Sequence, residues 1–162
     1  MATKRWEFLT ELESRLSLIR VTNGYNTDLG KFIHHGKTMV LEDGSVYEVP
    51  ISVTDYNDYP YIKVSMLDGE TTHTGRQGPF HIEMNLEVTG VIWAVDNEPL
   101  KLEQIHEDLE NGIQFDKLFS PGVQVRYASF KYNAREVGEH QGSVTIVVVA
   151  RVPHCFEYPT TN

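Results

Sequence analysis

The sequence predicts an α+β fold, with one largely antiparallel, twisted sheet and two helices packed on one of its faces. Three observations support this prediction. Apolar residues recur at helical spacing in two separate segments, apolar and polar residues alternate strictly in a segment between them, and the strand-like segments are joined by turn signals. Segregated helices with short antiparallel connections are typical of this class.

The first helical segment spans residues 5–20. Its apolar residues recur at spacings of three and four, so on a helix they form one stripe, which comprises Trp6, Leu9, Leu12, Leu16 and Ile19. Thr3 is a suitable N-cap. We expect the helix to stop at residues 21–24, where a β-branched pair and an Asn-Gly step break the pattern.

The stretch that follows the helix, VTNGYNTDLGKFIHHG, could be either a binding site or a structural corner. Asn23-Gly24 suits a helix end, Tyr25 offers a ring to anchor the turn, and Thr27 and Asp28 can bond to nearby backbone N–H groups. We therefore interpret the stretch as a corner that leads into a short strand at residues 31–33.

The adjacent histidines His34 and His35 are poor candidates for a shared metal site. Neighbours on a strand point to opposite faces, whereas zinc ligands on a strand usually sit two residues apart. An exposed pair of strand-end histidines is the simpler interpretation.

The middle of the chain is predicted to be strands and turns. Residues 40–50 have two β-prone arms around Asp43-Gly44 and predict a hairpin, and a further strand is expected at residues 61–67. Residues 68–79 contain no apolar residue before Pro79, so we expect a mobile excursion between two strands.

The clearest strand signal is FHIEMNLEV, residues 80–88, in which apolar and polar residues alternate with period two. At Thr89-Gly90 the alternation slips and Val91, Trp93 and Val95 take the apolar positions. The slip predicts a β-bulge or a bend at the glycine.

A second helix is predicted to start at residues 96–99 and to end at Asn111-Gly112, with an apolar stripe of Leu102, Ile105 and Leu109. Residues 123–130 and 143–152 are two further strands. The polar segment between them predicts a hairpin with a loose tip.

Length and composition favour one domain over residues 1–162, with irregular ends at 1–4 and 153–162. The single cysteine, Cys155, permits no intrachain disulfide. The first twenty residues contain no apolar signal region and the longest apolar run is too short to span a bilayer, so we expect a soluble protein and no membrane partner. With a formal net charge of −9 and scattered bases, binding to nucleic acid is disfavoured.

No motif carries recognisable chemistry. The histidines show no metal-binding spacing, and Cys155 beside His154 is a poor nucleophile–base pair. Glu83 and Glu87, and likewise Glu103, Glu107 and Glu110, are most simply solvated surface residues. The sequence also lacks both glycine-rich nucleotide motifs. We therefore expect no enzyme activity, no catalytic residue, no cofactor and no metal.

In the order of their expected elements and in their residue patterns, residues 5–152 resemble the tail terminator (tail completion, or minor tail) proteins of long-tailed bacteriophages. An amphipathic helix runs into GYNTDLG, residues 24–30, which is similar to a G-Y-x-T-D-x-G-type corner in that family. A short strand, a turn, YPYIKVSML and a long alternating strand follow. The segment LKLEQIHEDLENGI is similar to the family's second helix, and a polar hairpin with an apolar last strand closes the chain.

The resemblance implies a structural protein of the virion, assembled in the host cytoplasm. Six copies would form a homo-oligomeric ring that caps the tail tube protein, ends its polymerisation and offers a surface to the head–neck connector protein. DNA would only pass through the lumen, without specific binding. A neck or head–tail joining protein is the rival hypothesis, and a small enzyme or metal-binding domain using His34, His35 or His81 is a third.

The expected subunit and tube contacts are the hairpin at 40–50, the loop at 68–79 and the tip at 133–142. Within them the candidate interface residues are Tyr47, Arg76, Arg135 and Glu139. Arg76 is the only base in its loop, and arginine is enriched at protein–protein contacts.

Overall fold

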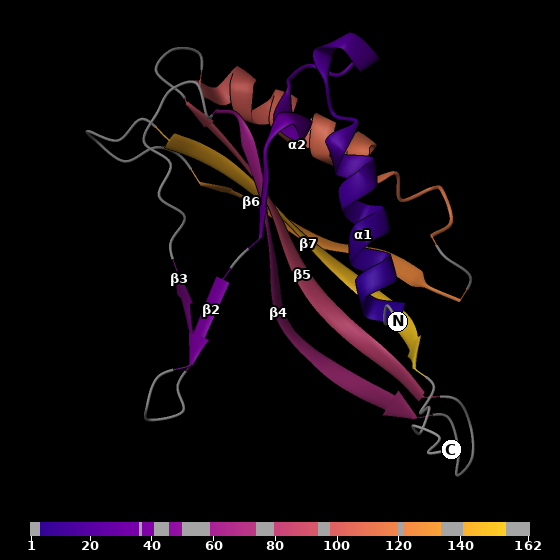
Figure 1. Cartoon of the computed structure of the whole chain (residues 1–162). Coiled ribbons are helices and arrows are strands. Elements are labelled where there is room, and N and C mark those ends of the chain that lie inside the picture. Colours follow the sequence, from indigo (N-terminus) through magenta and orange to yellow (C-terminus); the bar gives the residue numbers. More distant parts are fainter. Residues whose placement is uncertain are drawn as a thin grey trace, which may run out of the picture.

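In the computed structural model of this chain, residues 4–35, 37–40, 46–49, 59–73, 80–93, 98–119, 122–133 and 141–154 are described. Figure 1 shows both helices on one side of a twisted sheet. The elements in chain order are α1 (Lys4–Ser17), η1 (Val21–Asn23), η2 (Leu29–Lys31), β1 (Ile33–His35), β2 (Lys37–Val40), β3 (Val46–Val49), β4 (Tyr61–His73), β5 (Phe80–Trp93), α2 (Glu98–Ile113), β6 (Gln124–Asn133) and β7 (Gln141–His154).

The main sheet has five strands in the order β1-β4-β5-β7-β6, and β2 and β3 form a separate two-stranded sheet. Neighbouring strands of the main sheet are antiparallel except β1 and β4, which are parallel. The fold is therefore α+β with a mostly antiparallel sheet, as the sequence predicts. The expected hairpins are also present, as the antiparallel pairs β2–β3 and β6–β7.

The stripe on α1 differs from the predicted one at its start. Phe8, Leu9, Leu12 and Leu16 are buried, whereas the side chain of Trp6 is 57% exposed. Residues two apart on a helix lie about 200° apart, so burying Phe8 turns Trp6 to the outside. Phe8 is held by an aromatic contact with Phe119, with ring centroids 5.2 Å apart.

The stripe on α2 is confirmed and continues beyond its predicted end. Leu102, Ile105, Leu109 and Ile113 are all buried. Gly112 lies inside the helix, and a glycine suits this position because the side chain of Ile19 packs against it. A Cβ at Gly112 would lie 2.4 Å from Ile19 Cδ1. The glycine marks a close contact between elements rather than the helix end.

The predicted bulge at Gly90 is wrong, because β5 pairs with both neighbours across Gly90 without a register shift. Gly90 occupies a core position under α2, where a Cβ would lie 2.6 Å from Ile105 Cγ2. Val91 points to the other face, where it forms a small apolar cluster with Tyr61, packed by Phe32 and Tyr59.

The predicted excursion at residues 68–79 is also wrong in its first half. Residues 68–73 continue β4 and pair with β5 as far as His73 opposite Phe80, after a register shift between Met66 and Gly69. Backbone hydrogen bonds hold this polar extension, and such bonds do not require apolar side chains. Residues 74–79 lie outside the described part of the chain.

The corner is broader than expected. α1 ends at Ser17, ahead of the predicted stop, and Gly24, with φ of 92°, closes a separate 3-10 turn at Val21–Asn23. The first strand begins at Ile33, because Leu29–Lys31 forms a second 3-10 turn in place of the predicted strand at 31–33. Gly30 brings this turn against α1, and its N–H donates to the carbonyl oxygen of Ile19 at 2.9 Å.

Arg15 joins the two helices. Its guanidinium donates to the backbone carbonyl oxygens of Ile113, Gln114, Lys117 and Leu118, at 2.7 to 3.3 Å. The same group lies 3.6 Å from the centroid of the Phe119 ring and pairs with Glu11 at 3.2 Å. Carbonyls at a helix C-terminus lack partners within the helix, so Arg15 supplies donors there from a second helix.

Candidate functional site

Asp108 on α2 organises the corner. Its side chain is 1% exposed and accepts four hydrogen bonds. Oδ1 accepts from the backbone N–H and the side-chain amide of Asn26, at 3.0 and 3.1 Å, and Oδ2 accepts from the backbone N–H and hydroxyl of Thr27, at 2.8 and 2.6 Å. A buried carboxylate without partners would be costly. Here every bond ties the corner to α2.

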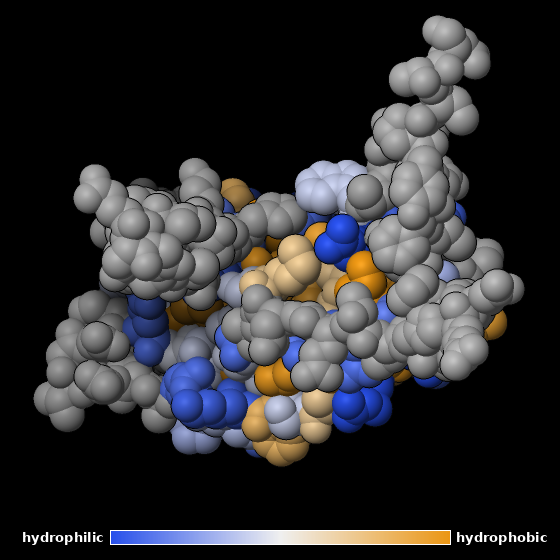
Figure 2. Space-filling view, turned by 90° about the horizontal axis from the view of Figure 1, so that it is seen from below, coloured by the Kyte–Doolittle hydropathy of each residue, from blue (hydrophilic) through white to orange (hydrophobic). Residues whose placement is uncertain are grey.

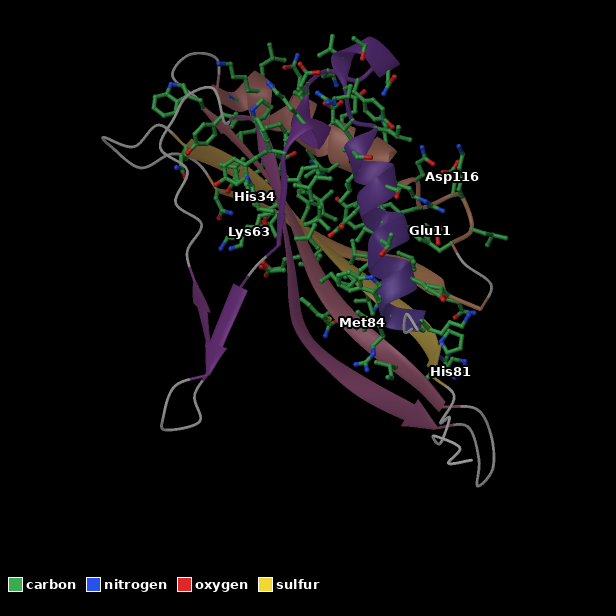
Figure 3. The ribbon with its side chains drawn as sticks, in the orientation of Figure 1. Glu11, His34, Lys63, His81, Met84 and Asp116 are labelled. Carbon is green, nitrogen blue, oxygen red and sulfur yellow. The ribbon has the colours of Figure 1, made fainter. Side chains whose placement is uncertain are left out.

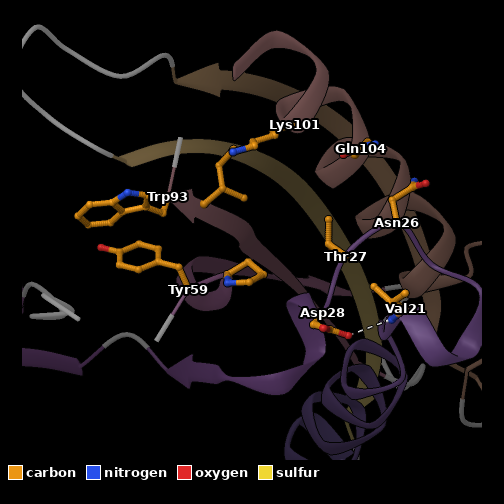
Figure 4. Close-up of a pocket in the computed structure, with 10 residues that line it drawn as sticks. Val21, Asn26, Thr27, Asp28, Tyr59, Trp93, Lys101 and Gln104 are labelled. Atoms are coloured by element: carbon orange, nitrogen blue, oxygen red, sulfur yellow. Dashed lines mark hydrogen bonds between the residues drawn. The ribbon is translucent and has the colours of Figure 1, made fainter. Parts of the chain in front are cut away.

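A hollow of about 320 Å³ lies beside this corner (Figure 4). Tyr59, Pro60 and Trp93 form one wall, with the rings of Tyr59 and Trp93 in an edge contact at 5.5 Å. The residues from the corner face them: Asn26, Thr27 and Asp28. Val21, Ile92, and Lys101 and Gln104 of α2 complete the lining.

The ten lining residues include no histidine, cysteine or serine, and the proton of the Thr27 hydroxyl is donated to Asp108. Asp28 Oδ1 accepts from the Val21 N–H at 3.0 Å. An aromatic wall with polar groups at its rim suits holding a side chain or another planar group.

A second polar cluster joins α2 to β6 around the buried His106. Its Nε2 lies 2.9 Å from the hydroxyl of Tyr127 and 2.6 Å from Oε1 of Glu110, and its Nδ1 contacts the hydroxyl of Tyr132. That hydroxyl also donates to Glu103 at 3.2 Å. The cluster is buried on one side by Phe130, whose ring centroid lies 4.5 Å from that of His106.

The phenols of this cluster are hard to ionise. Burial, followed by the negative charge of Glu110 and by Tyr132, raises the pKa of Tyr127 to about 12. Burial and the nearby Glu103 also raise the pKa of Tyr132. Both hydroxyls therefore keep their protons at neutral pH and serve as fixed hydrogen-bonding groups. None of these residues lines the hollow, and their contacts fasten α2 to the edge of the sheet.

The face of the sheet opposite the helices carries the charged and polar residues of the strands. Glu83 lies opposite Arg151 on β7, and the hydroxyls of Thr89 and Thr145 are 3.0 Å apart. Lys63 lies opposite Thr89 and beside His34 of β1, and Figure 3 shows Lys63 and His34 together, away from both helices. No helix in the described part of the chain packs on this face.

Apolar and charged residues are mixed on the surface. Figure 2 shows hydrophobic side chains next to strongly hydrophilic ones on the face seen from below. Large apolar side chains that are exposed elsewhere include Trp6 on α1, Leu100 on α2 and Phe130 on β6. A contact surface on this protein would therefore combine small apolar areas with charges, as interfaces of non-obligate complexes do.

The structure places one of the four candidate interface residues. Tyr47 lies on β3, opposite Met39 of β2. Arg76, Arg135 and Glu139 lie outside the described residues, as does Cys155, so their roles stay predictions.

Of the histidines considered for a metal site, His34 makes an edge contact with the ring of Tyr61, with centroids 5.2 Å apart. His81 lies near the start of β5, at the opposite end of the strand from Trp93 (Figure 3). Within the described residues, no group of three or more His, Cys, Asp or Glu side chains is arranged to hold a metal ion.

The chain matches no known protein family, and no curated protein is similar enough to count as a relative. Neither helix of the described structure has the length and apolar character that crossing a membrane requires.

The two polar clusters were missed at the level of sequence. Glu103 and Glu110 are exposed, as expected, but they also contact Tyr132 and His106, which the sequence did not indicate. A weak signal was present, because His106 and Asp108 border the buried stripe of α2, next to Ile105 and Leu109. A polar residue at such a border must find a partner or reach solvent, and its partner depends on the fold.

Proposed function

We propose that this protein is a phage tail terminator, a structural subunit that forms a ring, hexameric by resemblance, on the end of the tail tube. The ring would end tube polymerisation and present a surface to the head–neck connector, while DNA passes through its lumen. The proposal rests first on the resemblance in sequence. The order of elements in the fold, from helix and corner to hairpin, long strands, helix and final hairpin, agrees with what that resemblance implies.

The observation that carries most weight is the β2–β3 hairpin. It forms its own two-stranded sheet and stands off the main sheet, away from both helices (Figure 1). An isolated two-stranded hairpin is at best marginally stable in water. A hairpin that forms a sheet of its own in this position is well suited to contact another protein.

The sheet face on which no helix of the described residues packs, and the edges of the sheet, support the same proposal. Unpaired edges and exposed faces are available to neighbours in an assembly, and a ring requires two different contact surfaces on each subunit. The hollow beside the corner, with its aromatic wall and polar rim, offers positions for a partner's side chain.

The proposal can be tested with purified protein and tail tubes. Light scattering over a range of concentrations should show a defined oligomer, and electron microscopy should show rings at one end of each tube. Added to polymerising tube protein, the terminator should shorten the tubes. A strictly monomeric protein that fails to bind tubes would rule the proposal out.

Removal of the protein from the phage separates a terminator from a joining protein. Overlong tails are the expected result for a terminator. Tails of normal length that stay unattached to heads would instead show a head–tail joining role.

A further inference from the structure

Strand β6 forms one edge of the main sheet. It pairs with β7 along one side, and none of the described strands pairs with its other side. Residues 128–131, in the middle of the strand, are all exposed. An unpaired edge presents backbone N–H and C=O groups that can pair with an added strand. This edge is therefore accessible to another chain.

A register shift between Tyr127 and Ser129 divides the edge. Beyond the shift, residues 129–133 pair with β7 without interruption. A run of this length is close to that of an ordinary strand. An added strand of about seven residues, laid along this run, would extend past the shift as far as Arg126.

The side of the edge that faces away from the helices is basic. Arg126 and Lys131 are exposed there, because Val125 and Tyr132, their neighbours in the strand, pack against the core. The residues of β7 that lie opposite these two bases are uncharged. β6 contains no acid, although the formal net charge of the chain is −9. On this side an added strand would meet two positive charges.

The helix side of the edge is apolar and acidic. Phe130 is 53% exposed, and its ring centroid lies 4.5 Å from that of His106 on α2. The exposed Glu110 pairs with His106 at 2.6 Å. The exposed Glu103 accepts a hydrogen bond from Tyr132 of β6 at 3.2 Å. On this side an added strand would meet an aromatic ring and two carboxylates.

We propose that β6 binds an extended segment of another protein as a further strand, and that acidic residues alternate with apolar or basic residues in this segment. Successive side chains of a strand point to opposite faces. The acids would therefore face Arg126 and Lys131, and the residues between them would face Phe130 and the two glutamates. Backbone hydrogen bonds supply affinity in strand addition, and the alternate side chains supply specificity. The inference goes beyond the proposed function and does not depend on it.

Other occupants fit the edge less well. Placing β6 of a second copy beside it would bring like charges together, which is unfavourable at a contact. The other described edge of the main sheet, β1, has three residues and no acid. Nucleic acid gains affinity from clustered bases, whereas Glu103 and Glu110 border this edge. Exposed charges and bulges commonly prevent identical edges from pairing, and they leave an oppositely charged strand able to bind.

Synthetic peptides of about seven residues, within the usual length of a strand, serve as probes. Fluorescence anisotropy should show that the natural protein binds a labelled peptide in which glutamate alternates with valine. A peptide with lysine in place of each glutamate should bind at least about tenfold more weakly.

Two further peptides separate strand addition from simple charge attraction. A peptide of glutamate alone carries more charge but should bind more weakly, because every second acid would face Glu103 and Glu110. Proline at the centre of the glutamate–valine peptide should abolish binding, since proline lacks the backbone N–H that pairing needs.

Charge reversal on the protein provides the matching test. Arg126→Glu with Lys131→Glu should weaken binding of the glutamate–valine peptide at least about tenfold and strengthen binding of the lysine–valine peptide. A matched control reverses two exposed bases on the helical side, Arg5 and Lys117, to glutamate. It carries the same change in net charge and should bind both peptides as the natural protein does.

Circular dichroism with thermal unfolding verifies that each variant is folded. If the double edge variant fails to fold, Lys131→Gln alone still tests the contact. It removes one exposed base and should weaken binding of the glutamate–valine peptide about threefold, the effect of one exposed ion pair.

The inference is overturned if the natural protein does not bind the glutamate–valine peptide, or if folded edge and control variants bind it equally well. It is also overturned if the edge variant changes the oligomeric size in light scattering, since β6 would then be a contact between copies. If the natural protein binds a single-stranded oligonucleotide but no peptide, and the edge variant loses that binding, β6 is a surface for nucleic acid instead. Failure of the tube experiments would leave this inference standing.

Discussion

Asp108 and Thr27 are joined by a hydrogen bond of 2.6 Å between Oδ2 and the hydroxyl, although 81 residues separate them in the chain. Together with the bonds from Asn26, this contact fixes the corner to α2. We predict that Asp108→Ala lowers the free energy of unfolding by about 3 kcal/mol, because buried donors lose their acceptor. Urea denaturation measures the change. Glu107→Ala, an exposed neighbour on the same helix, should stay within about 0.5 kcal/mol of the natural protein. Equal stability of Asp108→Ala and Glu107→Ala would contradict the assignment.

We expect that lysine cannot replace Arg15 without a loss of stability. Arg15→Ala removes the donors to four carbonyls and the contact with Phe119, so we expect a loss of about 2 kcal/mol. Arg15→Lys keeps the charge, but a single ammonium cannot span the carbonyls while lying on the ring, so at least half of the loss should remain. Arg5→Ala is the exposed control on the same helix. A lysine variant as stable as the natural protein would show that only charge matters there.

Substitution by alanine should lower stability by different amounts at two close-packed glycines. At Gly30 a Cβ would meet the backbone oxygens of Leu16 and Ser17 at 2.5 and 2.7 Å, and backbone cannot easily move aside. We expect Gly30→Ala to cost about 3 kcal/mol, at the upper end of overpacking effects. At Gly112 the obstacle is the flexible end of Ile19, and alanine gains about 1 kcal/mol of helix propensity. Gly112→Ala should therefore cost about 1 kcal/mol or less. Thermal unfolding of both variants compares them, and the reverse order would refute the packing described for the corner.

The side chains of Tyr61 and Tyr127 should ionise at a higher pH in the folded protein than in the unfolded protein. Burial, with a smaller effect of Tyr59, raises the pKa of Tyr61 to about 12, and the pKa of Tyr127 is also raised to about 12. Because the folded pKa exceeds the ordinary value of 10.0, the stabilising contribution is complete below pH 10 and is lost as the pH rises through 12. Absorbance of tyrosinate should show these groups ionising near pH 12 when folded and near pH 10 in denaturant. In Tyr61→Phe the late step should shrink, and an unchanged late step would argue against the burial of Tyr61.

The sequence was sufficient for elements whose signal is repeated along the chain. The buried stripe of α2 and the alternation in β5 each rest on several residues that agree, so one exception does not change the prediction. The fold class followed from the order of these elements.

Features that depend on one residue and a distant neighbour were not predictable. Gly90 resembles a bulge in the sequence, but it makes room for Ile105, which approaches from α2. Residues 68–73 resemble a loop by composition, yet they are held as a strand by backbone pairing to β5. Asp108 and His106 resemble surface residues until the corner and β6 are placed beside them.

The β2–β3 hairpin begins two residues after the end of β1 and shares no sheet with it. Damage to the two parts should therefore have separate consequences. A defect around Asp108 or Arg15 should reduce the amount of folded protein, whereas a defect confined to the hairpin should leave a normal amount of folded protein. Under the proposed function that folded protein would fail to assemble, so protein yield alone would sort the two kinds of mutation.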